Sequence, residues 1–358
     1  MSNYSDNNLN GSSERLIEVE DLNVSFFTPS GEVKAVRGVS WHLDKGEALG
    51  IVGESGSGKS VSAYSIMGLL QSPGKVTGGR VMMDGKNILD LSEQEMRTIR
   101  GNDIAMIFQD PMTSLNPVFT IGNQLMEPLV HHLKIKGETA EKRAVKLLAD
   151  VGIPSPERRI KQYSFEFSGG MRQRAMIAMA LACEPKLLIA DEPTTALDVT
   201  IQAQILEIMK NLKDNTGMSI VMITHDLGII SEVCDKVIIM YGGKIVEYAT
   251  VDELYRKPSH QYTIGLLGSL PRLDDEQKNP LKPIEGSPVD LMNPPKGCAF
   301  APRCEKCMKI CLDEQPPYYE VEKDHYSACW LHFVENYQAE ISQKDGAENN
   351  NIGGADNE

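Results

Sequence analysis

The chain of 358 residues is longer than one average domain, and with 41% hydrophobic residues it can bury a full core. Its formal net charge of −14 disfavours a partner held by many phosphate contacts, which argues against a DNA- or RNA-binding protein. Because it has neither an uninterrupted apolar run near the roughly 20 residues that span a bilayer nor the basic and apolar regions of a secretion signal, we expect a protein kept in the cytosol.

The two ends of the chain differ in composition from the segments between them. Residues 1–14 and 337–358 are polar and rich in Asn and Gly, so we expect them to be disordered. Between them, apolar β-type runs alternate with helical patterns, which predicts an α/β fold with strands buried on both faces of a parallel sheet. The expected strands cover 16–27, 47–53, 103–109, 186–192, 219–225 and 236–248, and the expected helices cover 59–70, 199–212 and 253–257.

Two segments depart from this alternation. The stretch from about Val118 is poor in strands and has helical patterns at 121–133 and 139–152, so we expect a helical insert at about 118–185 within an α/β domain of residues 15–260. After about Lys257 prolines cluster, which marks a linker and a small, loop-rich module at 261–336.

A glycine-rich loop follows the expected strand at 47–53 and precedes a helix. The run GESGSGKS fits the pattern G-x-x-x-x-G-K-[ST] in the strand-loop-helix context that confirms it. Its glycines let backbone N–H groups turn toward phosphates, Lys59 reaches the β- and γ-phosphates, and Ser60 can ligate Mg²⁺. The nucleotide-binding residues predicted here are Gly53, Glu54, Ser55, Gly56, Ser57, Gly58, Lys59 and Ser60.

Polar side chains also stand at the ends of three other expected strands. Asp191 is placed to hold Mg²⁺, and Glu192 can polarise an attacking water as a general base. Gln109 and His225 end the strands at 103–109 and 219–225. Open α/β folds bind their ligands at the carboxyl edge of the sheet, so we expect these side chains to face one site.

A second turn suited to an anion lies at FSGGMRQR, residues 167–174. Ser168 is a good helix N-cap, and Gly169 and Gly170 expose backbone amides at the start of a helix. A capped helix with a flexible entry would account for the same residues. One chain that binds one ATP has no evident need for this second turn, whereas two subunits facing head to tail could close it on the γ-phosphate held by the other.

Taken in order, these motifs resemble the nucleotide-binding subunit of an ATP-binding-cassette (ABC) transporter over about residues 15–260. The resemblance implies a P-loop ABC ATPase core with a mixed sheet, a helical signature subdomain and a small Cys-containing C-terminal extension. It implies a Walker A loop at 53–60, a signature at 168–171, where Met171 replaces the usual Gln, a D-loop aspartate at Asp198 and a switch histidine at His225.

The same resemblance assigns roles to individual residues. It implies catalytic roles for Glu192, His225 and Gln109, and Mg²⁺ ligation by Ser60, Gln109 and Asp191. It adds Ser168, Gly169, Gly170 and Asp198 to the nucleotide-binding residues, together with Phe26, which falls where the family stacks an aromatic ring on adenine; Phe27 is a possible substitute.

The end of the chain resembles oligopeptide and dipeptide importer ATPases. SHQYTIGLLGSLPRL and EGSPVDLMNPPKGCAFAPRC are similar to their C-terminal extension, as are FEFSGGMRQR and FQDPMTSLNP elsewhere. The resemblance implies a peripheral protein on the cytoplasmic side of the cell membrane that pairs with a second ABC ATPase beneath two permeases. The permeases receive peptide from an extracellular binding protein, and residues 110–119 touch the permeases. The alternatives are a nickel or sugar importer ATPase, a soluble ABC ATPase acting on nucleic acid or ribosomes, and a noncatalytic ATP sensor.

Five of the seven cysteines crowd the C-terminal region, whereas Cys183 and Cys234 lie in apolar surroundings. In a reducing compartment this crowding favours a metal over disulfides. The importer pattern matches Cys298, Cys304, Cys311 and Cys329 and leaves Cys307 as an extra cysteine. Such a set could hold a [4Fe-4S] cluster, as the resemblance implies for some members, or zinc, or no metal.

Overall fold

A computed structural model describes residues 15–110, 114–195, 198–270 and 283–334 of the chain. The segments 1–14 and 337–358, for which we expect disorder, lie outside the described residues, as do 111–113 within the predicted permease-contacting stretch. Within the described residues, no helix combines the length and the apolar character needed to cross a bilayer.

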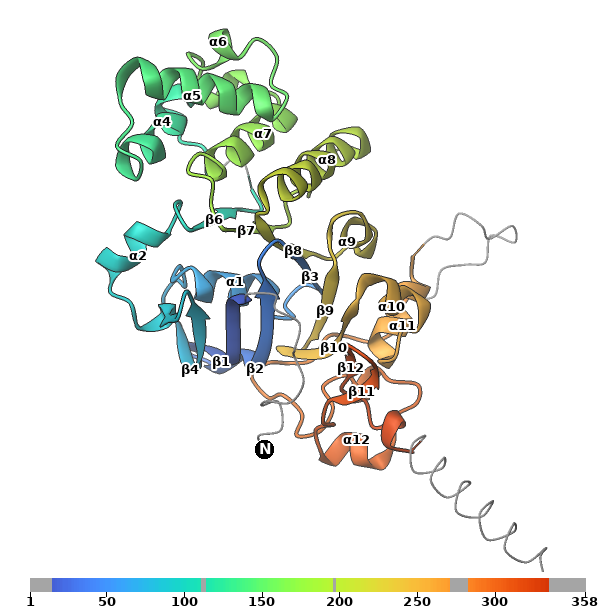
Figure 1. Cartoon of the computed structure of the whole chain (residues 1–358). Helices are drawn as coiled ribbons and strands as arrows, with labels where there is room; N and C mark the ends of the chain where they lie inside the picture. The colour runs from blue at the N-terminus through green and yellow to red at the C-terminus, as the bar shows by residue number, and fades with distance from the viewer. Residues whose placement is uncertain (1–14, 111–113, 196–197, 271–282, 335–358) are drawn as a thin grey trace, which may run out of the picture.

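An eight-stranded mixed sheet forms the centre of the molecule (Figure 1). Its strand order is β11-β12-β10-β9-β3-β8-β7-β6. The parallel part consists of β9 (Lys236–Tyr241), β3 (Ala48–Val52), β8 (Ser219–Thr224), β7 (Leu187–Asp191) and β6 (Ile104–Ile107). Every residue of β3, β6, β7 and β8 is buried, so the predicted parallel sheet with two covered faces is confirmed.

The antiparallel edge of this sheet comes from the end of the ATPase region and from the C-terminal extension. β10 (Lys244–Thr250) pairs with β9, and the short strands β12 (His325–Ser327) and β11 (Tyr319–Glu322) continue the sheet outward. The run predicted as one strand at 236–248 is therefore a hairpin. It turns at Gly242 and Gly243, whose φ values of 56° and 77° suit glycine.

A second, four-stranded antiparallel sheet was not predicted from the sequence beyond its first strand. It has the order β2-β1-β4-β5, formed by β2 (Gly31–Asp44), β1 (Arg15–Thr28), β4 (Gly74–Met83) and β5 (Lys86–Asn87). Its apolar side chains share a core with α1 (Lys59–Ile66), which ends four residues before the predicted limit because Gly68 adopts φ +59°.

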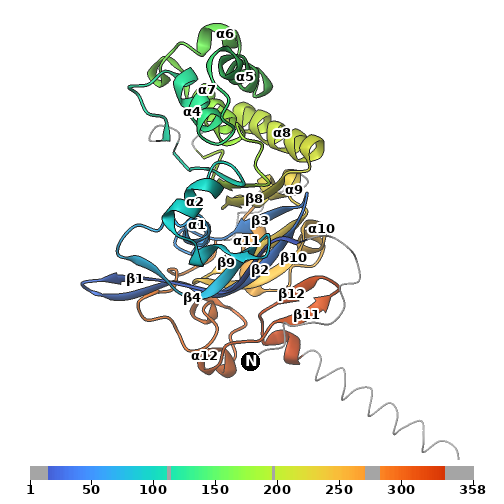
Figure 2. The same ribbon diagram turned by 60° about the vertical axis from the view of Figure 1, so that its left-hand side comes forward.

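The helices fall into groups with different positions (Figures 1 and 2). α4 (Ile121–His131), α5 (Gly137–Asp150), α6 (Pro156–Arg159) and α7 (Gly169–Ala180) gather at one end, as the predicted helical insert requires. α12 (Lys309–Asp313) lies with β11 and β12 at the opposite end. The remaining helices are α2 (Glu93–Ile99), α8 (Val199–Thr216), α9 (Leu227–Val233), α10 (Val251–Arg256) and α11 (Gln261–Gly268), with short 3₁₀ turns at Ile88–Asp90, Ser164–Glu166 and Ala301–Arg303.

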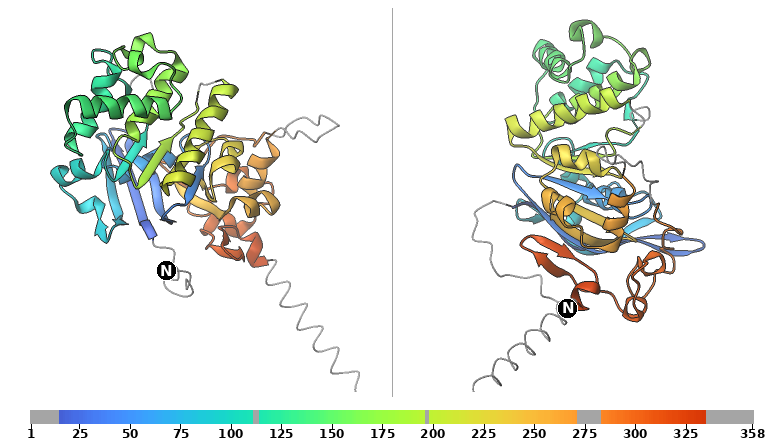
Figure 3. Two further views of the ribbon diagram at one scale, coloured as in Figure 1. Left: turned by 45° about the horizontal axis from the view of Figure 1, so that its top comes forward. Right: turned by 90° about the vertical axis from the view of Figure 1, so that its right-hand side faces the viewer.

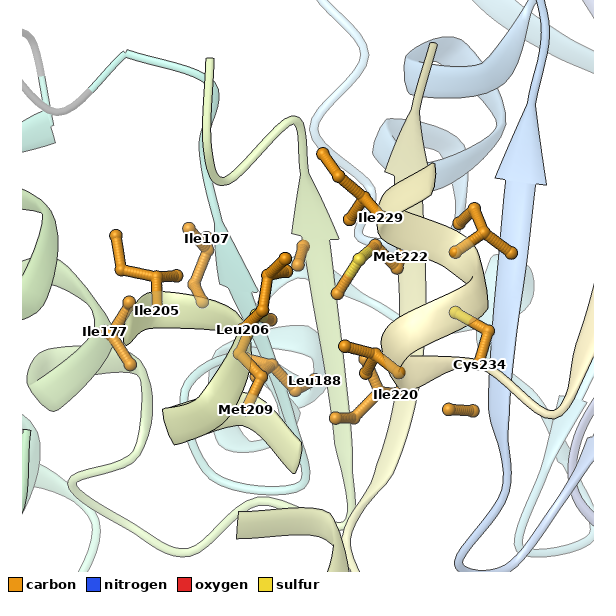
Figure 4. Packing of buried hydrophobic residues seen from close by; sticks show 14 of the residues in the cluster. Ile107, Ile177, Leu188, Ile205, Leu206, Met209, Ile220, Met222, Ile229 and Cys234 are labelled. Atoms are coloured by element: carbon orange, nitrogen blue, oxygen red, sulfur yellow. The ribbon is translucent and has the colours of Figure 1, made fainter. Parts of the chain in front are cut away.

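α8 joins the helical group to the large sheet (Figures 2 and 3). Ile205, Leu206 and Met209 on its buried face belong to one apolar cluster with Ile177 of α7 and Leu188 of β7 (Figure 4). A continuous apolar core therefore packs the helical group against the large sheet at β7.

A buried carboxylate–imidazole contact docks the C-terminal extension on the sheet. Glu247 of β10 and His325 of β12 are both 0% exposed, and the imidazole Nε2 lies 2.8 Å from Glu247 Oε1. The carboxylate also accepts backbone N–H bonds of 2.8 Å from Ser259 and His260. Glu247 thus fixes both the segment that leads into α11 and the strand that ends the extension.

Replacing this carboxylate should loosen the extension. We expect Glu247→Ala to cost about 3 kcal/mol, because removal of one member leaves a buried polar partner unsatisfied. The measurement is the melting temperature of the purified protein together with the rate at which protease releases the extension. The control is Glu322→Gln, which removes a solvent-exposed partner of Arg256 and Lys257 and should change neither. If Glu247→Ala changed neither the melting temperature nor the rate of protease release, other contacts would hold the extension.

Candidate functional site

The carboxyl ends of the parallel strands bring the predicted polar residues to one edge of the large sheet. The glycine-rich loop follows β3, Gln109 follows β6, Asp191 and Glu192 end β7, and His225 follows β8. Strand register keeps them level, since Val52 pairs with Thr224 and Asp191 pairs with Ile223. Figure 1 shows these strand ends beneath the helical group.

The glycine-rich loop of residues 53–60, called the P-loop below, needs glycine at three positions for two reasons. Gly56 and Gly58 have φ values of +78° and +101°, in the region where side chains are strained. A Cβ on Gly53 would stand 2.3 Å from the carbonyl oxygen of Met240, and one on Gly58 would stand 2.4 Å from that of Ala35. The loop is therefore pressed against β9 and β2, and its backbone leads directly into the N-terminus of α1.

Lys59 is a buried cation at the start of α1, with 6% of its surface exposed. Its Nζ donates to the carbonyl oxygens of Gly53 at 2.7 Å and Glu54 at 3.0 Å, which ties the two ends of the loop together. Burial lowers the pKa of Lys59, and the negative charges of Glu192 and Asp191 oppose this shift.

Ser60 and Asp191 are in direct contact and leave an oxygen free for a cation. The Ser60 hydroxyl donates to Asp191 Oδ1 at 2.8 Å, whereas the buried Oδ2 has no hydrogen-bond partner among the described residues. Burial raises the pKa of Asp191, and hydrogen bonds from the hydroxyls of Ser60 and Tyr64 only partly oppose it. A hydroxyl beside a carboxylate with an unsatisfied buried oxygen suits Mg²⁺, a hard cation that prefers oxygen ligands.

Glu192 is held from three sides. Its carboxylate accepts hydrogen bonds from Gln109 Nε2 at 2.8 Å and from the Thr195 hydroxyl at 2.9 Å, and His225 Nδ1 lies 3.3 Å away. Its backbone has φ +48°, a strained value for a non-glycine residue of the kind that gathers at functional sites. The structure thus joins the three residues predicted to be catalytic and adds Thr195, which no sequence pattern singled out.

The environment of Glu192 keeps it ionised. Burial opposes ionisation, but hydrogen bonds from Thr195 and His225 outweigh it and lower the pKa of the carboxyl. Because the folded-state pKa is depressed, the carboxylate persists through neutral pH and is lost only as pH falls below the ordinary range of glutamate. A carboxylate in this position is therefore able to accept a proton at physiological pH.

The serine-glycine turn of Ser168, Gly169 and Gly170 lies elsewhere in the molecule. Ser168 caps α7 by accepting from the N–H of Met171 at 3.4 Å. The turn lines a cavity of about 440 Å³ together with Asp198, which caps α8. This cavity is lined by the helical group and the start of α8, not by the P-loop, so within one chain the two predicted anion sites stay apart.

Phe26 lies in the four-stranded sheet rather than among the strand ends. Its ring is pressed against Gly74 of β4, where an added Cβ would come within 2.7 Å of it. The neighbouring Phe27 is 48% exposed.

The four cysteines of the importer pattern converge at the far end of the chain, and we call them the cysteine module. Cys298, Cys304, Cys311 and Cys329 line one small cavity of about 20 Å³. Burial raises the pKa of Cys298 to about 12, and the other three thiols add to the shift. Across the described ranges no three His, Cys, Asp or Glu side chains have a spacing that could hold a metal ion, so the donors converge without metal-site geometry.

Two family models match the chain. Residues 36–195 match "ABC transporter", and residues 246–311 match "Oligopeptide/dipeptide transporter, C-terminal region". The first match includes the P-loop, and the second includes three of the four cysteines of the module.

Solved structures with the same fold include a dimeric ATP-binding cassette. The dimeric post-hydrolysis state of MJ0796 bound to ADP and Pi has a TM-score of 0.60 and 28% identity, covering 66% of this chain and 99% of that chain. CbiO1 from Clostridium perfringens, part of the transporter complex cbiONQ, has a TM-score of 0.58 and 27% identity over 71% of this chain and 95% of its own.

Curated relatives match over nearly the whole chain. The oligopeptide transport ATP-binding protein OppD of Bacillus subtilis is 57% identical over 88% of this chain and 89% of its own length. The dipeptide transport ATP-binding protein DppD of the same organism is 54% identical over 89% and 95%, and OppD of Salmonella typhimurium is 50% identical over 88% and 93%. This chain therefore belongs to the oligopeptide/dipeptide family of ABC transporter ATP-binding proteins.

Proposed function

We propose that this chain is the ATP-hydrolysing subunit that drives import of oligopeptides or dipeptides through a membrane ABC transporter. The observation that carries the proposal is the cluster of Ser60, Asp191, Glu192, Gln109 and His225 at one sheet edge, in a chain related to named oligopeptide and dipeptide transport proteins. Phosphoryl transfer needs positioned charge more than covalent chemistry, and this cluster supplies it.

The P-loop binds the triphosphate of ATP in this proposal. Backbone N–H groups of the P-loop that are not bonded within the protein would hold the phosphates together with Lys59, and Phe26 would pack on the adenine. Ser60, Asp191 and Gln109 would hold Mg²⁺, which would neutralise phosphate charge. Glu192 orients and deprotonates the attacking water, and His225 keeps the Glu192 carboxylate in place through the contact at 3.3 Å.

Hydrolysis requires a second ABC ATPase subunit. The serine-glycine turn and Asp198 line a cavity away from the P-loop of the same chain, so they are available to a nucleotide held by a partner. The dimeric cassettes among the similar structures support this arrangement. ATP joins the two subunits, hydrolysis releases them, and the two permeases above them follow that motion while an extracellular binding protein delivers peptide.

The subunit acts at the cytoplasmic face of the cell membrane. We propose that the chain has two functional parts. Residues 15–260 form the ATPase domain with its helical insert at about 118–185, and residues 261–336 form the importer-type extension. The nickel, sugar and nucleic-acid alternatives have less support, because the relatives described above are named for oligopeptide or dipeptide transport.

Assembly and transport test the function together. A tagged chain purified in mild detergent should bring two permeases and a second ATPase, and deletion of its gene should abolish uptake of labelled peptides while Glu192→Gln fails to restore it. Nickel or sugar permeases in the preparation, or unchanged peptide uptake in the deletion strain, would contradict the proposal.

We further propose that the cysteine module holds a metal group bound by thiolates. The importer pattern favours a [4Fe-4S] cluster over zinc. Four converging thiols are the donor set that either group requires, and bound metal would overcome the raised pKa of Cys298. The described residues show no group of three donors at metal-site spacing, so the proposal rests on the four-cysteine pattern and on the cavity that these thiols share.

Anaerobic purification distinguishes the outcomes for this module. We expect a brown protein with visible absorbance and about four iron atoms per chain, both lost in Cys304→Ser and retained in Cys307→Ser, the matched control. A colourless protein with one zinc would assign the module to zinc. Absence of both metals would overturn the proposal.

A further inference from the structure

The C-terminal extension contacts the P-loop through one side chain. Nη1 of Arg303, in the short 3₁₀ turn Ala301–Arg303, donates to Glu54 Oε2 at 2.7 Å. The two residues are separated by 249 positions in sequence. Their side chains are 6% and 25% exposed, so this is a largely buried ion pair between the extension and the phosphate-binding loop.

Contacts other than the one with Glu54 also fix the guanidinium of Arg303. Its Nε and Nη2 donate to the carbonyl oxygens of Glu285 at 2.9 Å and Ile284 at 3.0 Å. The guanidinium carbon also lies 5.8 Å from the ring centre of Tyr241 and 6.0 Å from that of Phe300. A planar guanidinium with its donors assigned in this way is preorganised, and lysine could not make the same set of contacts.

A second contact from the same side holds the backbone of Glu54. The N–H of Glu54 donates to the hydroxyl of Tyr262 in α11 at 2.9 Å. Tyr262 is 0% exposed and packs against Tyr241 and Phe300, with ring centres 4.7 and 5.4 Å away. Burial raises the pKa of Tyr262, so the phenol stays neutral and keeps its proton. Glu54 is thus fixed from outside the ATPase core at both its side chain and its amide.

The same residue is linked to the phosphate-binding lysine. The carbonyl oxygen of Glu54 accepts a hydrogen bond of 3.0 Å from Lys59 Nζ. A displacement of Glu54 would therefore move the carbonyl that positions the ammonium group, as well as the amides that follow it in the loop. Hydrogen bonds connect Arg303 to Lys59 through the single residue Glu54.

We infer that Arg303 is a positioning residue for ATP: by holding Glu54, the C-terminal extension keeps the P-loop in the shape that receives the phosphates. The inference rests on the proposed ATPase function and assigns the extension a part in nucleotide binding. Arg303 touches no reacting atom. Its neighbour Cys304 lines the cysteine cavity, so the chain runs from that cavity directly into this contact.

Arg303→Gln in the complete transporter tests the inference. Removing a buried charge-assisted hydrogen bond should let the loop relax, so we expect the KM for ATP and the Kd for a fluorescent ATP analogue to rise about tenfold. The kcat should stay within about twofold, because the bond is made equally in the ground and transition states. Arg303→Lys should give an intermediate loss, since it keeps the charge without the planar fork.

The matched control is Glu322→Gln. Glu322 pairs with Arg256 and Lys257, another ion pair between the extension and the ATPase domain, but it has no link to the P-loop. This variant should bind and hydrolyse ATP like the wild type. An equal rise of KM in Glu322→Gln would mean that losing any ion pair between the extension and the ATPase domain has this effect, which would overturn the inference.

A double-mutant cycle with Glu54→Gln identifies the route. If Arg303 acts through Glu54, the double variant should bind the ATP analogue no more weakly than Arg303→Gln alone. Additive losses, or an unchanged Kd in both single variants, would contradict the inference.

If the melting temperature shows that Arg303→Gln does not fold, the Kd of Glu54→Gln for the ATP analogue tests the inference by itself. A wild-type transporter that binds ATP but imports no peptide would refute the proposed transport function and leave this test intact.

Discussion

Glu192→Gln should reduce ATP turnover by about 10²- to 10⁴-fold, the contribution of a positioned general base. Nucleotide affinity should stay within about threefold, because the amide keeps the size of the side chain and an oxygen for Thr195. The measurement is phosphate release by the assembled transporter, together with binding of a fluorescent ATP analogue.

The exposed carboxylate of Glu207 on α8 provides a matched control for this change. Glu207→Gln removes the same charge from the surface and should leave turnover unchanged. Normal hydrolysis by Glu192→Gln would show that another group activates the water, despite the three contacts that converge on Glu192.

Lys59→Ala should weaken both binding and turnover, in contrast to the glutamate variant. Lys59 is the buried cation of the P-loop, and loss of one such preorganised charge donor costs about 10²- to 10³-fold in kcat/KM. The pattern to look for is a raised Kd for the ATP analogue together with a lowered kcat.

Lys210→Ala on the exposed face of α8 is the control for this second variant. It should match the wild type in both measurements. If Lys59→Ala bound the analogue normally, the ammonium group would not contact phosphate, and its bonds to Gly53 and Glu54 would be purely structural.

The parallel centre of the fold could be predicted because its strands are short, wholly apolar and followed by polar residues. β3, β6, β7 and β8 have no exposed face, so their sequences carry an unambiguous pattern. Parallel strands also bring their carboxyl ends together, which is why the gathering of Gln109, Glu192 and His225 follows from sequence order.

The antiparallel sheet was harder to predict, because its strands are only partly buried. β4 contains three glycines and only two of its ten residues are buried, which conceals a strand signal. Its pairing with β1 depends on register shifts that no local pattern specifies.

Two contacts could not be predicted from the sequence. Thr195 reaches Glu192 because the backbone turns at φ +48°, and Arg303 reaches Glu54 because β12 docks the extension on β10. The first depends on a local backbone turn and the second on tertiary packing, and neither leaves a periodicity in the sequence.

The central claim is that the serine-glycine turn of one subunit completes the ATP site of the other. The most direct measurement is the structure of the Glu192→Gln transporter trapped with ATP and Mg²⁺. We predict Ser168 Oγ within about 3 Å of a γ-phosphate oxygen of the ATP bound to the partner subunit. A nucleotide-loaded assembly in which Ser168 faces solvent, far from any phosphate, would contradict the account.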